Sequence, residues 1–169
     1  MLVFGWDLAG YEKKGLFVFL EYTPMKVKTM LEEGGGSIES IVLNKKISRI
    51  VIDSITSFEL LFQDEFKKRE ATFALFNMIT KWHCTSLLTL EEHALEEGTG
   101  ASTRAVEFES DSIIMLYYLR TKDRRERFLE ILKMRATPHS KRIYHFDMDK
   151  TGIVVDKKPS TRLPRILQG

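Results

Sequence analysis

Residues 48–54 read SRIVIDS, and this stretch decides the fold. It is a continuous β-branched run, which is typical of a central parallel strand covered on both faces. A second apolar run, CTSLLTL, occupies residues 84–90. Residues 65–82 between them carry apolar side chains at helical spacing: Phe66, Ala71, Phe73, Leu75, Phe76 and Ile79. Strand, helix and strand at this spacing predict a right-handed crossover unit and an α/β fold.

The flanking segments extend this pattern in both directions. Upstream, residues 15–22 (GLFVFLEY) predict a buried strand, residues 25–36 (MKVKTMLEEGGG) a short amphipathic segment, and residues 37–47 a helix opened by Ser37. Downstream, SIIMLYYL, RFLEILKMR, KRIYHFDM and GIVV are four β-like runs joined by short turns. They predict an antiparallel hairpin extension of a mostly parallel, helix-flanked sheet. We expect one domain over residues 1–155 and a loosely held tail over residues 156–169.

The composition limits the classes of function. The chain has 169 residues, 43% of them hydrophobic, which suits one globular domain. Lys and Arg number 26 against 24 Asp and Glu, so the net charge of +2 favours no polyanion partner, and residues 120–128 (RTKDRRERF) are the one candidate basic patch. Cys84 is the only cysteine, which excludes an internal disulfide. No apolar run approaches ~20 residues, so we expect no membrane span and a cytoplasmic location.

Polar side chains follow both strands of the predicted crossover. Asp53 ends the first strand at the carboxyl edge, where ligands bind in open α/β sheets, and its carboxylate is suited to Mg²⁺. The alternative is a helix cap at the start of DSITSFELL. Thr89 and Glu91 end the second strand. If the two strands are adjacent, these residues lie beside Asp53 and are candidates to orient a water or sense a γ-phosphate; otherwise they form a polar strand end.

Residues 133–139, KMRATPH, close the second of the downstream β-runs. Alternation along an extended chain places Lys133 and Arg135 on one face and Met134 on the other. Two converging cations predict an anionic target. The alternative is a pair of solvated cations with Met134 in the core.

Five stretches together resemble the KaiC branch of the RecA-type P-loop ATPases, which includes the archaeal RadA-like paralogues. They are FGWDLAGYEKKGLF, RIVIDSIT, TSLLTLEE, AVEFESDSIIML and, most specifically, LEILKMRATPHSKRIYHFDMDKTGIVV. The resemblance implies a RecA-like fold, ATP and Mg²⁺ as cofactors, and a ring of subunits with nucleotide between neighbours. Ala136 departs from the family's glycine at its position.

The same resemblance implies roles for individual residues. Asp53 matches the magnesium-site (Walker B) aspartate. Glu91 and Thr89, from their place at the neighbouring strand end, are the catalytic and nucleotide-binding candidates beside it. Lys133 and Arg135 would reach the γ-phosphate in the next subunit, as trans-acting cations do in phosphoryl transfer. The remaining residues that would line the nucleotide are Met134, Thr137, His139 and Asp149.

The front of the family's pattern is missing. Neither a GxxxxGK[ST] phosphate loop nor a catalytic glutamate pair occurs, residues 32–40 (EEGGGSIES) lack the Lys-Ser/Thr, and we interpret Glu21 as non-catalytic. The chain is therefore predicted to be the family's domain without its first third, and tight ATP binding by the chain alone is not expected. Two functions stay open: an ATPase module acting in assembly on DNA or in signalling, and an inactive module that associates with a full-length paralogue. Whether DNA, RNA or a protein is the partner also stays open, and the assignment as an enzyme is left undecided.

Overall fold

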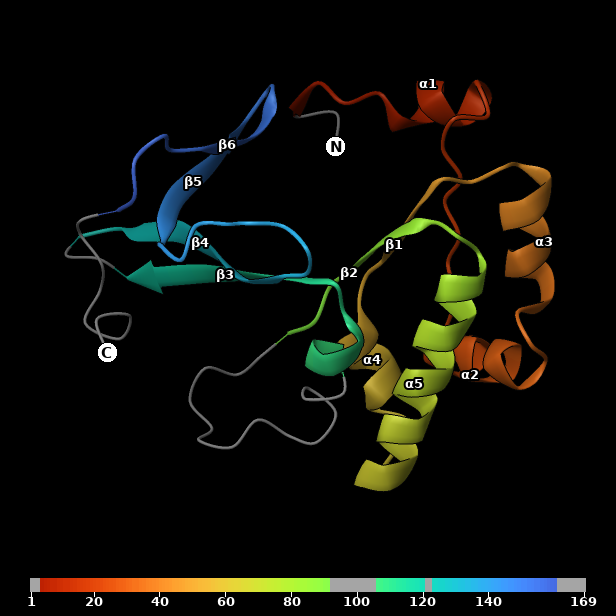
Figure 1. Ribbon diagram of the computed structural model, residues 1–169. Coiled ribbons are helices and arrows are strands. Elements are labelled where there is room, and N and C mark those ends of the chain that lie inside the picture. The colour runs from red at the N-terminus through yellow and green to blue at the C-terminus, as the bar shows by residue number, and fades with distance from the viewer. Residues whose placement is uncertain (1–3, 92–105, 121–122, 161–169) are drawn as a thin grey trace. The chain divides into compact units, whose positions relative to one another are not determined.

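The computed structural model of the protein describes residues 4–91, 106–120 and 123–160 (Figure 1). Its contacts divide the chain into two compact units. The middle unit comprises residues 20–109, and the terminal unit combines residues 1–19 with residues 110–169. In the part of the chain that is described, no helix is both long and apolar enough to cross a membrane.

The middle unit contains the predicted crossover. Its elements are α2 (Pro24–Glu32), α3 (Gly36–Asn44), β1 (Arg49–Ile52), α4 (Ile55–Glu59), α5 (Glu65–Lys81) and β2 (Thr85–Leu88). Two of the helices begin at side-chain caps: the Thr23 hydroxyl accepts the Lys26 N–H at α2, and the Asp64 carboxylate accepts the Lys67 N–H at α5. β1 and β2 pair in parallel, with Ile52 opposite Leu88, so the predicted strand–helix–strand unit is confirmed.

Three consecutive glycines lie between the end of α2 and the start of α3, and the third is the first residue of α3. Gly34, Gly35 and Gly36 all have positive φ, and the Gly35 N–H donates to the Met30 carbonyl oxygen over 2.9 Å. Glycine adopts this left-handed backbone without the penalty that a Cβ brings. Gly35 is consequently the N-cap of α3, and the prediction that Ser37 opens this helix was wrong by two positions.

One apolar core holds the middle unit together. Its buried side chains come from the four helices and the residue after α5: Met30, Val42, Ile55, Phe58, Leu75, Met78, Ile79 and Trp82. Ile50 and Ile52 of β1 and Leu88 of β2 pack against this core, whereas Val51 and Leu87 on the other face are more than half exposed. The prediction that β1 is covered on both faces was therefore wrong for the described residues, because the core lies against one face of the strand pair.

One further expectation about an apolar segment was also wrong. Residues 15–22 form no strand, and Leu16 and Phe19 are largely exposed, because no described strand pairs with this segment. On α5 the buried residues are Thr72, Leu75, Met78 and Ile79, and Phe66 is 75% exposed. Thr72 satisfies its hydroxyl by donating to the Lys68 carbonyl oxygen, which lets a polar residue occupy the buried stripe.

The terminal unit is built on an antiparallel sheet. After α1 (Leu8–Lys13), the strands β3 (Ser112–Arg120), β4 (Arg125–Met134), β5 (Tyr144–Asp149) and β6 (Gly152–Val155) pair in the order β3-β4-β5-β6. All four predicted β-runs are thus confirmed as antiparallel neighbours. They form a sheet of their own, whereas the sequence predicted an extension of the parallel sheet; the described ladders do not connect the two sheets.

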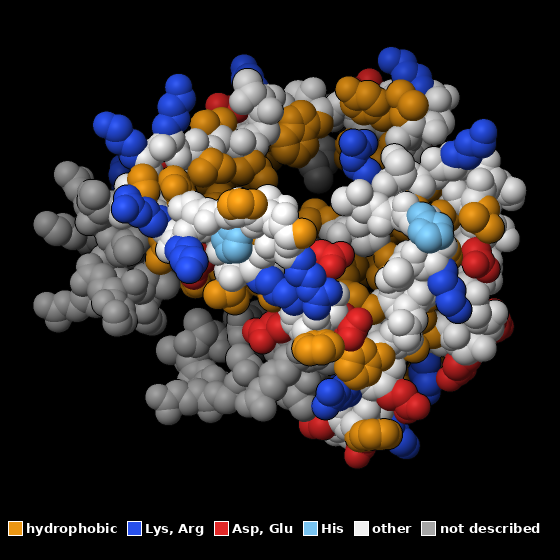
Figure 2. Space-filling model, in the orientation of Figure 1, with side chains coloured by type: hydrophobic (Ala, Val, Ile, Leu, Met, Phe, Trp, Pro, Cys, Tyr) orange, Lys and Arg blue, Asp and Glu red, His pale blue; other side chains and the backbone are white. Residues whose placement is uncertain are grey.

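A bulge interrupts the β3–β4 ladder. Ile113 is opposite Lys133, but Ile114 is opposite Ile131, so Leu132 is the extra residue. Phe128 and Phe146 are the buried anchors of this sheet, while Ile114, Leu116, Tyr118 and Leu132 are more than half exposed. Apolar side chains that reach the molecular surface are visible on the face shown in Figure 2.

Candidate functional site

Asp53 and Thr89 meet at the carboxyl ends of the two parallel strands. Asp53 directly follows β1, and Thr89 directly follows β2. The Thr89 hydroxyl donates to Asp53 Oδ1 over 2.6 Å. Both side chains are exposed, so the second carboxylate oxygen can face a ligand arriving from solvent. The expected proximity of these two residues is therefore present in the structure.

The helix-cap alternative for Asp53 does not match the geometry. α4 begins at Ile55, and its N-cap is Ser54, not Asp53. The Ile55 N–H is bonded to the Thr89 carbonyl oxygen at 2.9 Å. The Asp53 carboxylate is instead oriented by a hydroxyl on the neighbouring strand end.

Glu91 is held beside this pair through its backbone. Its N–H donates to the Thr56 hydroxyl oxygen over 2.8 Å, and its side chain is exposed. Thr56 was not among the residues predicted from the sequence. The available signal was a hydroxyl residue one position into the helix that follows Asp53, a pattern that is equally common in helices without any site.

The donor set suits a magnesium ion. Mg²⁺ binds through one or two carboxylates, keeps several waters and takes substrate phosphate oxygens. Among the described residues no three His, Cys, Asp or Glu side chains gather at one point, so a cage made entirely of protein is not available there. One carboxylate with a fixed orientation and open surroundings matches the chemistry of a shared metal–phosphate site.

Lys133, Met134 and Arg135 lie at the end of β4, in the terminal unit. Lys133 and Met134 are opposite Ile113 and Ser112, and both are half-buried. Arg135 Nη1 lies 3.3 Å from Asp111 Oδ1. Met134 was expected in the core; it is only partly buried, because it is the last residue of the strand and faces a small serine.

Ala136 adopts φ 55°, in the left-handed region that favours glycine. The resemblance to the KaiC branch predicts a glycine at this position, and the backbone of Ala136 is one that a glycine adopts without strain. An alanine in this region costs roughly 1 kcal/mol relative to glycine. The backbone between Arg135 and the predicted nucleotide-facing residues therefore has a conformation that a glycine at position 136 would also adopt.

The remaining predicted residues also belong to the terminal unit. His139 Nδ1 lies 3.1 Å from the Thr137 carbonyl oxygen. Asp149 accepts both the Thr151 N–H at 2.7 Å and the Thr151 hydroxyl at 2.6 Å. These bonds, the hydroxyl first, hold the pKa of the Asp149 carboxyl below its usual value of 3.8. The predicted site residues therefore form two groups, one in each unit.

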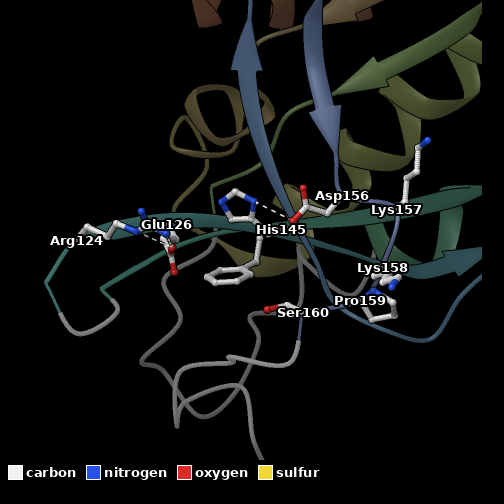
Figure 3. Close-up of a pocket in the computed structure, with 9 residues that line it drawn as sticks. Arg124, Glu126, His145, Asp156, Lys157, Lys158, Pro159 and Ser160 are labelled. Carbon is white, nitrogen blue, oxygen red and sulfur yellow. Dashed lines mark hydrogen bonds and ion pairs between the residues drawn. The ribbon is translucent and has the colours of Figure 1, made fainter.

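One hollow in the terminal unit contains none of them. It encloses about 630 Å³ and is lined by Arg124, Glu126, Phe128, His145, Asp156, Lys157, Lys158, Pro159 and Ser160 (Figure 3). Its acidic groups are already paired: Arg124 Nε donates to Glu126 Oε1 at 2.7 Å, and His145 Nδ1 lies 3.4 Å from Asp156 Oδ2. Lys157 points away from the hollow (Figure 3). A smaller hollow, lined by Leu116, Tyr117, Tyr118, Arg127 and Phe146, also excludes the predicted residues.

Asp156 and Ser160 are held by backbone hydrogen bonds to β5 and to the residue before it. The Asp156 N–H donates to the His145 carbonyl oxygen at 3.0 Å, and the Ser160 N–H to the Ile143 carbonyl oxygen at 2.9 Å. The rest of the segment predicted to be a loose tail, residues 161–169, lies outside the described residues.

Comparison with known proteins identifies the class. The family model described as "ATPase: KaiC" matches residues 1–160. The chain belongs to this family of ATPases, whose members share the RecA-like P-loop fold, and the resemblance to KaiC expected from the sequence is confirmed. The RadA-paralogue branch and the missing first third stay predictions.

Individual relatives agree with this assignment. The chain is 30% identical over 161 residues to the circadian clock protein KaiC3 of Synechocystis, covering 90% of this chain and 32% of that protein. It is 33% identical over 166 residues to a UPF0273 protein of Methanopyrus kandleri, covering 90% of this chain and 64% of the relative. The crystal structure of a KaiC-like protein from Pyrococcus horikoshii matches with a TM-score of 0.75 at 31% identity, covering 92% of this chain and 67% of that one. The chain thus spans between a third and two thirds of the length of these relatives.

Proposed function

We propose that this chain contributes part of an ATP site that is shared between neighbouring subunits of a KaiC-like ring, which is either a homo-oligomer or an assembly with a full-length paralogue. The observation that supports this most directly is the hydrogen bond from Thr89 to Asp53 at the carboxyl edge of a parallel strand pair. Ligands of open α/β sheets bind at this edge. The family assignment supplies the nucleotide as the ligand class.

Asp53 would hold Mg²⁺, directly or through water. Thr89 occupies Oδ1 of the carboxylate, which leaves Oδ2 for the ion or its hydration shell. When bound, the ion would neutralise charge on the phosphates. Glu91 follows two residues after Thr89 and would orient the attacking water or sense the γ-phosphate.

The terminal unit would provide the second half of a neighbour's site. Lys133 and Arg135 would contact the γ-phosphate in trans, while Met134, Thr137, His139 and Asp149 would line the nucleotide. An ammonium and a guanidinium stabilise the charge that spreads over the equatorial oxygens during phosphoryl transfer. Arg135 would exchange its contact with Asp111, which is 88% exposed, for the phosphate.

A complementation assay tests this proposal. The partner is a KaiC-family subunit that has its own phosphate loop but whose paired cations have been changed to alanine. Adding the full 169-residue chain should restore phosphate release, and adding the Lys133→Ala/Arg135→Ala variant should not. Restoration by both forms would rule out the trans role of the two cations.

The second candidate function is an inactive module that binds a full-length paralogue and lends it the cations. It is favoured by one sequence fact: no GxxxxGK[ST] motif occurs in the 169 residues. Because this motif provides the lysine and the backbone amides that cradle the phosphates, a chain without it depends on a partner. Hydrolysis by the chain alone would decide against this candidate. In the mixture, unchanged hydrolysis with the Asp53→Ala variant would support it, whereas loss of hydrolysis would support a site that uses Asp53 of this chain.

A further inference from the structure

The hydrogen bonds of the parallel strand pair follow a regular offset along the chain. The Thr85 N–H donates to the Ser48 carbonyl oxygen and the Thr89 N–H to the Ile52 carbonyl oxygen, both at 3.0 Å. In a parallel ladder every second N–H of one strand points at the same neighbour. The next donor in this series is the Glu91 N–H, and the same offset would pair it with residue 54.

The Glu91 N–H does not use that acceptor, because the chain has already turned from β1 into α4. The Glu91 N–H bonds instead to the Thr56 hydroxyl oxygen at 2.8 Å. A side chain thus takes the place of the strand carbonyl and continues the ladder by one step. Thr56 is half-buried, whereas its neighbour Ser57 is exposed.

The bond between Glu91 and Thr56 means that the chain is held by hydrogen bonds both at Thr89 and two residues after it. The Thr89 N–H is bonded to Ile52, its carbonyl oxygen accepts the Ile55 N–H, and its hydroxyl donates to Asp53. Fixing the Glu91 N–H two residues later restricts rotation of the backbone between residues 89 and 91. The orientation of the Thr89 hydroxyl toward Asp53 therefore depends on where the chain is held at residue 91.

We propose that Thr56 is a positioning residue of the Asp53 site: by accepting the Glu91 N–H, it keeps Thr89 and Glu91 aligned with the Asp53 carboxylate after the backbone ladder has ended. The metal-binding part of this inference rests on the proposed function. The orientation of the carboxylate by Thr56 does not. Groups that orient a metal-binding side chain change metal affinity by about 10–100-fold when they are removed.

The test compares Thr56→Val, which deletes the hydroxyl at nearly constant shape, with Thr56→Ser, which retains it. Ser57→Ala is the matched control on the same helix. The first readout is the ¹³C chemical shift of the Asp53 carboxyl carbon in the full chain. We expect Thr56→Val to move this resonance and Thr56→Ser and Ser57→Ala to leave it at the wild-type position. An unchanged resonance in a folded Thr56→Val variant would overturn the proposal.

The second readout is Mn²⁺ alone, detected by paramagnetic broadening of the Asp53 and Thr89 amide signals. We expect Thr56→Val to raise the half-saturating Mn²⁺ concentration by about tenfold. Thr56→Ser should keep it at the wild-type value. Equal Mn²⁺ affinity in the valine variant and the wild type would contradict the positioning role. If the wild type itself shows no broadening, the proposed metal site is wrong, and the carboxyl resonance still decides the role of Thr56. Thr56→Ala is the second deletion variant if the valine does not fold.

Discussion

Arg135 and Asp111 are joined twice, once through the backbone and once through their side chains. The Arg135 N–H donates to the Asp111 carbonyl oxygen over 2.8 Å, and Arg135 Nη1 lies 3.3 Å from Asp111 Oδ1. The backbone bond fixes the turn after β4, whereas the ion pair is largely open to water. One of the two cations proposed to act on a neighbouring nucleotide is therefore in contact with a carboxylate of its own chain, and this contact is weak enough to be exchanged.

The first prediction concerns that ion pair. Asp111→Ala should change the free energy of unfolding by less than ~1 kcal/mol, because exposed ion pairs contribute little. Urea unfolding of the variant and the wild type measures the difference. Asp111→Asn serves as a control that keeps the size of the side chain. A loss of several kcal/mol in both variants would mean that the pair is structural.

The second prediction concerns the paired cations. Lys133→Ala/Arg135→Ala should also unfold within ~1 kcal/mol of the wild type, because neither cation is buried in the core. Thermal unfolding followed by circular dichroism provides the measurement. This result is needed before loss of function in the complementation assay can be assigned to the missing charges. A collapse of the melting temperature would instead assign these side chains to the fold.

The third prediction separates the two apolar residues of β4 by their burial. Phe128 is 1% exposed, so Phe128→Ala should cost about 3–5 kcal/mol. Met134 is only half-buried, and Met134→Ala should cost less than ~2 kcal/mol, below the range for fully buried methionines. Both values come from urea unfolding under the same conditions. Equal costs for the two variants would show that Met134 is buried more fully than the structure shows.

These residues show how far the sequence could predict this protein. The crossover, the four antiparallel runs and the proximity of Asp53 to Thr89 could be predicted, because β-branched runs and strand ends determine them locally. The hydrogen bond between Thr56 and Glu91 could not be predicted, because it depends on how two strands that are 36 positions apart in the sequence are aligned with each other. The exposure of Phe66, Leu16 and Phe19 could not be predicted either, since an apolar segment alone does not show which other segment covers it. The bulge at Leu132 changes which side chains share a face of the sheet just before Lys133. The alternation of apolar and polar residues does not reveal it.

The fourth prediction is a pH effect at the β5–β6 turn. The Thr151 hydroxyl and N–H stabilise the ionised Asp149 carboxyl, so its pKa in the folded protein lies below 3.8. The stabilisation is present above pH 3.8 and is lost as the pH falls through the lower folded pKa. Thr151→Val removes the hydroxyl donor and should raise the pKa of Asp149 part of the way to the usual value. A carboxyl ¹³C titration of both proteins tests this, with Thr137→Ala as a control, and an unchanged titration in Thr151→Val would disprove the assignment.

The fifth prediction is that the 169-residue chain alone hydrolyses no ATP above background in the presence of Mg²⁺. The sequence offers no GxxxxGK[ST] loop, so no lysine and no backbone cradle hold the β- and γ-phosphates near Asp53. Catalysis of phosphoryl transfer consists almost entirely of positioning and charge stabilisation, and without the cradle the cations have no fixed target. Release of inorganic phosphate is the measurement, and Asp53→Ala is the control that should give the same trace. A steady rate in the wild type that disappears in Asp53→Ala would show that another part of this chain binds the phosphates, and the dependence on a partner subunit would then have to be abandoned.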